Sequence, residues 1–224
     1  NQFSRLGHES EFWVVSDRES VIVEKDSKTV LRFFQAENKT GKTRYHYSSA
    51  LCDNARKFNA DLHILKGLDG GMGDYLIRHF LIPESKPFAF IIGGTWWTRF
   101  VPRASFVLYE SSYQKEKLQT GDICSWRKKI PEKQLISLPK LIDTDRFKPI
   151  PEIKKEWDIL SVGRLTPGIK DYSSLGRVSD ICKTAVIGGG PALGSLKRKY
   201  PNITWLGPIE NSKLPEYYNR TRLF

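Results

Sequence analysis

Short apolar runs that end in glycine alternate with helical segments along the last third of the chain. The apolar runs cover 158–162, 185–187 and 203–206, and the glycines that follow them are at 163, 188–190 and 207. Helical patterns cover about 172–182, 193–200 and 212–219, and a fourth run begins at 223–224. Strands that alternate with helices at this spacing predict a parallel sheet with crossover connections. Glycines at the carboxyl ends of such strands mark the edge where doubly wound sheets bind ligands.

The first part of the chain shows a similar but less regular alternation of strand and helix candidates. Strand candidates cover 12–15, 20–23, 29–34, 62–65, 88–92 and 105–109, with helical patterns at 47–58, 75–81 and 111–118. The continuous apolar run 12–15 is typical of a strand buried on both faces. The glycine-rich segment 70–73 lacks the lysine and hydroxyl residue of a phosphate-binding P-loop, so it is predicted to be a flexible loop. A charged, proline-bounded stretch at 143–151 predicts a linker. We therefore expect an α/β protein with two Rossmann-like domains, 1–145 and 146–224.

Composition narrows the class of protein. The chain has 224 residues, of which 39% are apolar, which is enough to form a core. The net charge is spread along the chain, with +6 in residues 1–150 (24 basic minus 18 acidic) and +5 in 151–224 (12 minus 7). This surplus favours anionic partners in general. No apolar stretch approaches the roughly 18–20 residues of a membrane span. The three cysteines are widely spaced and the four histidines lack metal-ligand spacing, which argues against a disulfide scaffold or a metal site.

Two cations stand close to the best candidate site. Gly163 and Arg164 follow a predicted strand, and Lys170 precedes a predicted helix. Arginine offers planar bidentate donors that fit a phosphate, and a helix N-terminus favours an anion. A surface arginine and lysine on an ordinary connecting loop remain the alternative interpretation.

Five motifs follow one another in residues 138–224. They are Leu138-Pro139-Lys140-Leu141-Ile142-Asp143-Thr144-Asp145-Arg146-Phe147-Lys148-Pro149, Leu160-Ser161-Val162-Gly163-Arg164-Leu165, Gly188-Gly189-Gly190-Pro191, Ile203-Thr204-Trp205-Leu206-Gly207-Pro208-Ile209 and Leu214-Pro215-Glu216-Tyr217-Tyr218. In this order they resemble the retaining glycosyltransferases with the B-type fold, specifically the family-4-like group. Arg5-Leu6-Gly7-His8-Glu9 and Val107-Leu108-Tyr109-Glu110-Ser111 resemble motifs of the family's first domain more loosely.

The resemblance implies a metal-independent transfer of a sugar, with retained anomeric configuration, from a nucleoside diphosphate sugar to a glycan, lipid or small-molecule acceptor. No bound cofactor is implied, since the nucleotide sugar is a substrate. Arg164 and Lys170 match the family's diphosphate-binding pair. The matching nucleotide-proximal loops contain Gly163, Gly189, Gly190, Pro208 and Ile209, and the acceptor-side loop contains Gly93, Gly94 and Thr95. The family's acceptor-domain histidine has no match at this loop, so the catalytic residues stay unassigned.

The resemblance also predicts the setting of the chain. The widely spaced cysteines fit a reducing compartment, so a cytoplasmic location is expected. The diffuse positive charge predicts peripheral contact with an anionic membrane at its inner face and argues against a specific nucleic acid partner. The family's first strand and its paired glutamates have no match here, so the chain is expected to be an internal fragment that binds the donor weakly and turns over none. An exposed edge of the second sheet predicts a homodimer. Two alternatives remain open, a nucleotide-sugar epimerase of the same fold and a non-catalytic basic binding module.

Overall fold

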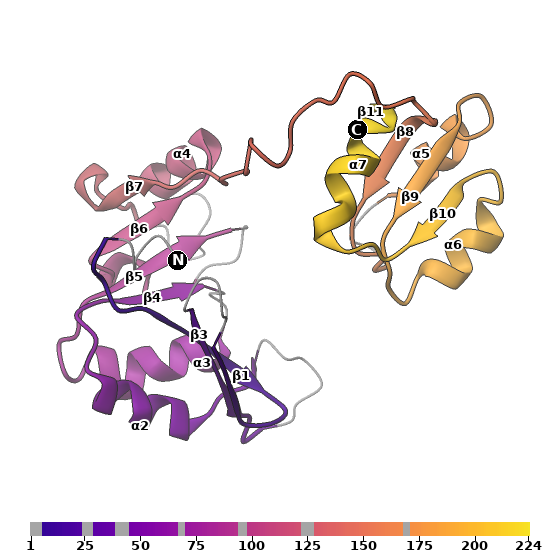
Figure 1. The fold of residues 1–224 in the computed structure, drawn as a ribbon. Helices are drawn as coiled ribbons and strands as arrows, with labels where there is room; N and C mark the ends of the chain where they lie inside the picture. Colours follow the sequence, from indigo (N-terminus) through magenta and orange to yellow (C-terminus); the bar gives the residue numbers. More distant parts are fainter. Residues whose placement is uncertain are drawn as a thin grey trace. The chain divides into compact units, whose positions relative to one another are not determined.

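The computed structural model describes residues 6–23, 29–38, 45–66, 70–93, 98–121, 128–167 and 171–224. The chain forms two compact units, Asn1–Lys140 (unit 1) and Leu141–Phe224 (unit 2). The described residues form an α/β protein with a small mixed sheet, sheet A, and two four-stranded parallel sheets, sheets B and C (Figure 1). Among the described helices, none combines the length and the apolar character needed to cross a membrane.

Sheet A opens unit 1 and has an apolar face that is left open. Its order is β1-β3-β2, where β1 (Glu11–Ser16) runs parallel and β2 (Ser20–Val23) antiparallel to β3 (Val30–Gln35). Trp13 and Val15 pack against the core of unit 1. Phe12 and Val14 point to the other face and are 53% and 45% exposed. The prediction that this strand is buried on both faces is therefore wrong, because the described residues cover only one face of β1.

Sheet B holds the most buried strand of unit 1. Its four parallel strands lie in chain order, β4 (His63–Lys66), β5 (Phe88–Ile92), β6 (Phe106–Tyr109) and β7 (Leu135–Ser137). The intervening helical segments are α3 (Gly71–Leu76), the π-helical turn η2 (Ile77–Leu81), η3 (Val101–Arg103), α4 (Ser112–Thr120) and η4 (Glu132–Gln134). The glycine-rich segment predicted to be a flexible loop contributes the first turn of α3 from Gly71 onward, so that prediction is wrong for residues 71–73.

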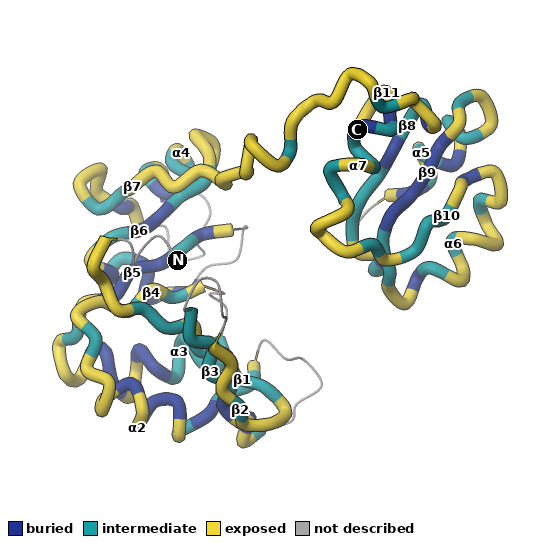
Figure 2. The backbone as a smooth tube through the Cα atoms, viewed as in Figure 1, coloured by how far each residue is buried: buried dark blue, intermediate teal, exposed yellow. Residues whose placement is uncertain are grey.

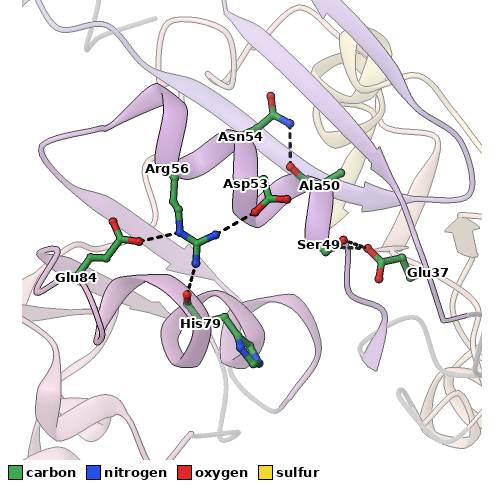
Figure 3. Close-up of polar contacts among 8 residues, drawn as sticks. All are labelled: Glu37, Ser49, Ala50, Asp53, Asn54, Arg56, His79 and Glu84. Atoms are coloured by element: carbon green, nitrogen blue, oxygen red, sulfur yellow. Dashed lines mark hydrogen bonds and ion pairs between the residues drawn. The ribbon is translucent and has the colours of Figure 1, made fainter.

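Arg56 ties the helix α2 (Ser49–Phe58) to the segment around η2. Its Nε donates to Glu84 at 2.7 Å and its Nη1 to Asp53 at 2.9 Å, while Nη2 donates to the backbone carbonyl of His79 (Figure 3). The guanidinium also lies 5.5 Å from the ring centroid of Phe80. Arg56 therefore donates to one acceptor on α2 and to two on the segment around η2, and these bonds hold the two segments of unit 1 together.

The N-terminus of α2 is closed by a carboxylate from the preceding segment. Ser48 is the N-cap residue, but its side chain makes no capping hydrogen bond. Glu37 instead accepts hydrogen bonds from both the backbone N–H and the hydroxyl of Ser49 (Figure 3). These two bonds lower the pKa of the Glu37 carboxyl group. A carboxylate therefore already occupies the position where the helix dipole favours an anion.

His63 makes the stability of unit 1 sensitive to pH. The ring lies 5.4 Å from Phe80, and its buried Nδ1 has no hydrogen-bond partner among the described residues. Burial, aided by the charge of Lys86, lowers the pKa of His63. The folded state therefore holds the neutral ring, and the unfolded chain binds the proton more readily. Stability from this group is present above about pH 6.5, the ordinary pKa of histidine, and is lost as the pH falls below it.

We expect His63→Leu to remove part of the loss of unfolding free energy that unit 1 shows between pH 7.5 and 5.5. Urea unfolding at several pH values measures this slope. The exposed His8 provides the control, because His8→Gln should leave the slope unchanged. Equal slopes for the native chain and His63→Leu would contradict this assignment.

Unit 2 is a doubly wound sheet. The strands of sheet C are β8 (Trp157–Val162), β9 (Thr184–Ile187), β10 (Thr204–Gly207) and β11 (Thr221–Leu223), all parallel, in the order β10-β9-β8-β11. The connecting helices are α5 (Ser173–Val178), α6 (Leu193–Lys199), the short η5 (Asn211–Lys213) and α7 (Leu214–Asn219). The predicted parallel sheet in this region is therefore confirmed, and so is a strand beginning near the end of the chain.

Both faces of sheet C carry a hydrophobic core. Val186 joins the cluster that includes residues of α5 and α6, whereas Ala185 and Ile187 join the cluster that includes residues of α7. All residues of β9 are buried (Figure 2). A strand flanked by helices on both faces needs apolar residues on both faces, which explains the continuous apolar run 185–187 in the sequence.

Part of the segment before β8 packs against the rest of unit 2. The buried side chain of Asn219 accepts a hydrogen bond from the N–H of Ile150 at 2.7 Å and donates to the carbonyls of Lys148 at 3.0 Å and Pro215 at 2.9 Å. The ring of Phe147 lies 5.9 Å from that of Tyr218. Residues 138–146, in contrast, are exposed throughout (Figure 2). Residues 147–150, part of the predicted linker 143–151, therefore pack on α7 rather than forming a free connection.

Candidate functional site

The strand order of sheet C places a ligand-binding position at one edge. The chain winds from β8 through β9 to β10 in one direction and then returns to the other side of β8 with β11. In doubly wound sheets, ligands bind outside the carboxyl ends of the strands at the point where the order reverses. For sheet C this point lies at the carboxyl ends of β8 and β11. The loop after β8 borders this point, and the loop after β9 lies on the other side of the β8 loop.

Those two loops are joined by backbone hydrogen bonds that continue the sheet. The N–H of Gly163 donates to Ile187 at 3.0 Å, and the N–H of Leu165 donates to Gly189 at 3.0 Å. A Cβ atom at Gly188 would lie 1.9 Å from the carbonyl oxygen of Gly163. The φ angle of Gly188 is +149°, a value that side chains rarely allow. At Gly188 and Gly190 the two loops therefore pack backbone against backbone, with no room for a side chain between them.

Arg164 lies in the loop after β8, with a fixed backbone and an exposed side chain. Its neighbour Leu165 is fully buried and packs in the core beneath α5 and α6. The carbonyl of Leu165 also accepts from the N–H of Ala192 at 3.0 Å, at the start of α6. The Arg164 guanidinium makes no hydrogen bond or ion pair with a described residue, so its donors are available to an anion.

The start of α5 differs from the expected anion site. Asp171 accepts hydrogen bonds from the N–H and the hydroxyl of Ser173, both at 2.8 Å. These bonds, together with the charges of Arg177 and Lys199, lower the pKa of Asp171. The Asp171 carboxylate therefore occupies the N-terminus of α5, where the sequence predicted a bound phosphate. Lys170, the second predicted diphosphate ligand, lies outside the described residues.

The remaining predicted site residues divide between the two units. Gly163, Gly189 and Gly190 lie in the joined loops of sheet C, and Pro208 follows β10 within van der Waals reach of a Cβ at Gly189. Ile209 follows Pro208, and its side chain packs with the cluster on the α7 face. Gly93 follows β5 in unit 1, and Gly94 and Thr95 lie outside the described residues. The structure therefore brings the described nucleotide-proximal residues to one edge of unit 2.

Sequence reasoning missed two features of this edge. The buried anchor Leu165 has no local signal, because its neighbours are polar or glycine. Tyr172 is also buried, which raises its pKa, and its hydroxyl has no partner among the described residues. In the parts of the chain that the structure describes, no group of three or more histidine, cysteine, aspartate or glutamate side chains is arranged to hold a metal ion.

Comparison with models of known protein families finds no match for this chain, and comparison with curated proteins finds none either. The fold and the site geometry are therefore the basis for the functional assignment.

Proposed function

We propose that the carboxyl edge of sheet C binds the diphosphate of a nucleoside diphosphate sugar, and that the chain is part of a retaining glycosyltransferase of the two-domain B type. The observation that carries this proposal is the position of Arg164. Its backbone is anchored by the buried Leu165, and its guanidinium has no partner among the described residues. Arg164 belongs to the loop after β8, beside the point where the strand order reverses and a doubly wound sheet binds its ligand.

Such a sugar transfer is favoured by a cation held at a fixed position beside the leaving diphosphate. As the bond between the anomeric carbon and the diphosphate oxygen breaks, its electron pair moves to the diphosphate and negative charge develops there. A preorganised guanidinium stabilises that charge more in the transition state than in the ground state. Because Gly188 and Gly190 have no side chain, the loop after β9 packs directly against the backbone of Gly163 and Leu165, which fixes the backbone on either side of Arg164.

Calorimetric titration with UDP and with GDP tests this proposal. One guanidinium and a few backbone donors, at about 1.5–3 kcal/mol for each charge-assisted contact, predict a dissociation constant of about 0.1–1 mM. We expect Arg164→Ala to weaken this binding by about tenfold or more. We expect no turnover of a sugar donor by this chain.

Arg198 supplies the matched control, because it is an exposed arginine on α6. Arg198→Ala should leave the affinity unchanged. The proposal fails if neither nucleotide binds at millimolar concentration, or if both arginine variants bind equally well. Micromolar affinity or measurable transfer would show instead that the chain carries a complete donor site.

A further inference from the structure

An open pocket lies between α5 and the end of α6 in unit 2. Its volume is about 360 Å³, which falls within the range of about 300–1,000 Å³ that is typical of small-molecule sites. It is lined by residues between 173 and 180 and by residues 199–202, all of which belong to the described part of the chain. None of the residues proposed above to bind the nucleotide lines this pocket. It is therefore a separate candidate for ligand binding.

A glycine and a tyrosine shape the pocket. A Cβ atom at Gly176 would overlap the ring of Tyr200, so the ring lies directly against α5. The N–H of Tyr200 donates to Leu196 at 2.9 Å, and its carbonyl accepts from Nε1 of Trp205 at 3.2 Å. The ring of Tyr200 and the neighbouring Pro201 therefore give the pocket an apolar wall in a fixed position.

Two cations line the pocket, one from each helix. Arg177 of α5 donates to the hydroxyl of Ser174 at 3.2 Å, and Lys199 of α6 lies with its Nζ 5.3 Å from the ring centroid of Tyr200. Within the described ranges, neither cation has a carboxylate at ion-pair distance. Both side chains belong to exposed residues, so their remaining donors are available to an anion.

The carboxylates near these cations are held by neutral donors. Asp180, which also lines the pocket, accepts from the side-chain amide of Asn202 at 2.8 Å. Asp171 accepts from the hydroxyl and the N–H of Ser173, both at 2.8 Å. These bonds lower the pKa of Asp171, and the charges of the two cations lower it further, which shows that both cations act on the same small region.

We infer that this pocket binds a small phosphate ester with a flat apolar body. A phosphate dianion has acceptors for both Arg177 and Lys199, whereas a single carboxylate would leave one of the two charges without compensation. The wall formed by Tyr200 and Pro201 covers the apolar body of the same ligand. The site belongs to unit 2 alone, and it does not depend on the proposed glycosyltransferase activity.

Phenyl phosphate is the probe, because it combines the dianion with a flat ring. Backbone amide NMR of the isotope-labelled whole chain, at constant ionic strength, reports both the affinity and the place of binding. We expect a dissociation constant of about 1 mM, with shifts at Gly176, Lys199, Tyr200 and Asn202. Inorganic phosphate should bind about threefold more weakly or worse, since it lacks the ring. Equal affinity for the two would overturn the role of the apolar wall.

Lys199→Gln and Arg177→Gln should each weaken phenyl phosphate binding by about tenfold or more. Lys197→Gln is the matched control, because Lys197 is an exposed lysine of α6 that does not line the pocket. It should leave the affinity unchanged. Arg164→Ala should also leave the shifts around the pocket unchanged, which separates this site from the donor site. Shifts confined to the loop of Arg164, or equal binding by the two lysine variants, would overturn the pocket site.

Discussion

Gly188→Ala is expected to lower the free energy of unfolding of unit 2 by on the order of 3–5 kcal/mol, the range of the most damaging single substitutions. The new methyl group would lie 1.9 Å from the carbonyl oxygen of Gly163, and that oxygen belongs to backbone, which cannot rotate away. The two loops would have to separate, with loss of the hydrogen bonds between them. Hydrogen exchange measured by mass spectrometry on peptides of unit 2 reports this loss directly.

Gly194→Ala is the matched control for that experiment. Gly194 lies on α6, and the nearest atom to its Cβ position is the guanidinium of Arg198 at 3.9 Å. Alanine should stabilise this helix by about 0.5–1 kcal/mol relative to glycine. If Gly188→Ala and Gly194→Ala changed exchange equally, the close contact between the loops would be refuted.

Asn219→Asp is expected to destabilise unit 2 by on the order of 3 kcal/mol. The amide nitrogen of Asn219 donates to the carbonyls of Lys148 and Pro215, and a carboxylate would place a second oxygen against both. Its buried charge should raise the pKa of the new carboxyl group. The free energies of unfolding of the variant and the native chain should therefore converge as the pH falls toward about 4. At that pH the carboxyl group is protonated and can again donate a hydrogen bond.

Hydrogen exchange of residues 147–150 and of α7 measures this effect. Asn211→Asp serves as the control, since Asn211 is exposed at the start of η5 and should shift stability by no more than about 0.5 kcal/mol. A variant at Asn219 that exchanged like the native chain would show that the amide does not hold residues 147–150 in place.

Features set by neighbouring residues could be predicted from the sequence. The hydroxyl of Ser111 accepts a hydrogen bond from the N–H of Gln114, and a serine at the start of a helical pattern predicts such a cap because capping depends on residues three positions apart. The alternation of apolar runs and helical patterns likewise predicts sheet C, since β9 requires apolar residues on both of its faces.

Features that join distant residues could not be predicted. Nothing local shows that Asn219 binds the backbone near Lys148, or that Gly188 touches Gly163. The open face of sheet A also escaped prediction, because Phe12 and Val14 have the composition of a buried strand. For the candidate site, the glycines that follow the apolar runs predict that ligands bind at the carboxyl edge of sheet C. The anchoring role of Leu165 and the carboxylate cap of α5 depend on packing and on side-chain rotamers.

The strand order of sheet C also determines how the candidate site assembles. Strand β11 pairs with β8, and the contact between Thr221 and Trp157 joins residues 64 positions apart. The pairings of β8 with β9 and of β9 with β10 close shorter loops, so the pairing of β11 has the largest loop-closure entropy within the sheet. The edge between β8 and β11 therefore depends on the most distant strand pairing in unit 2.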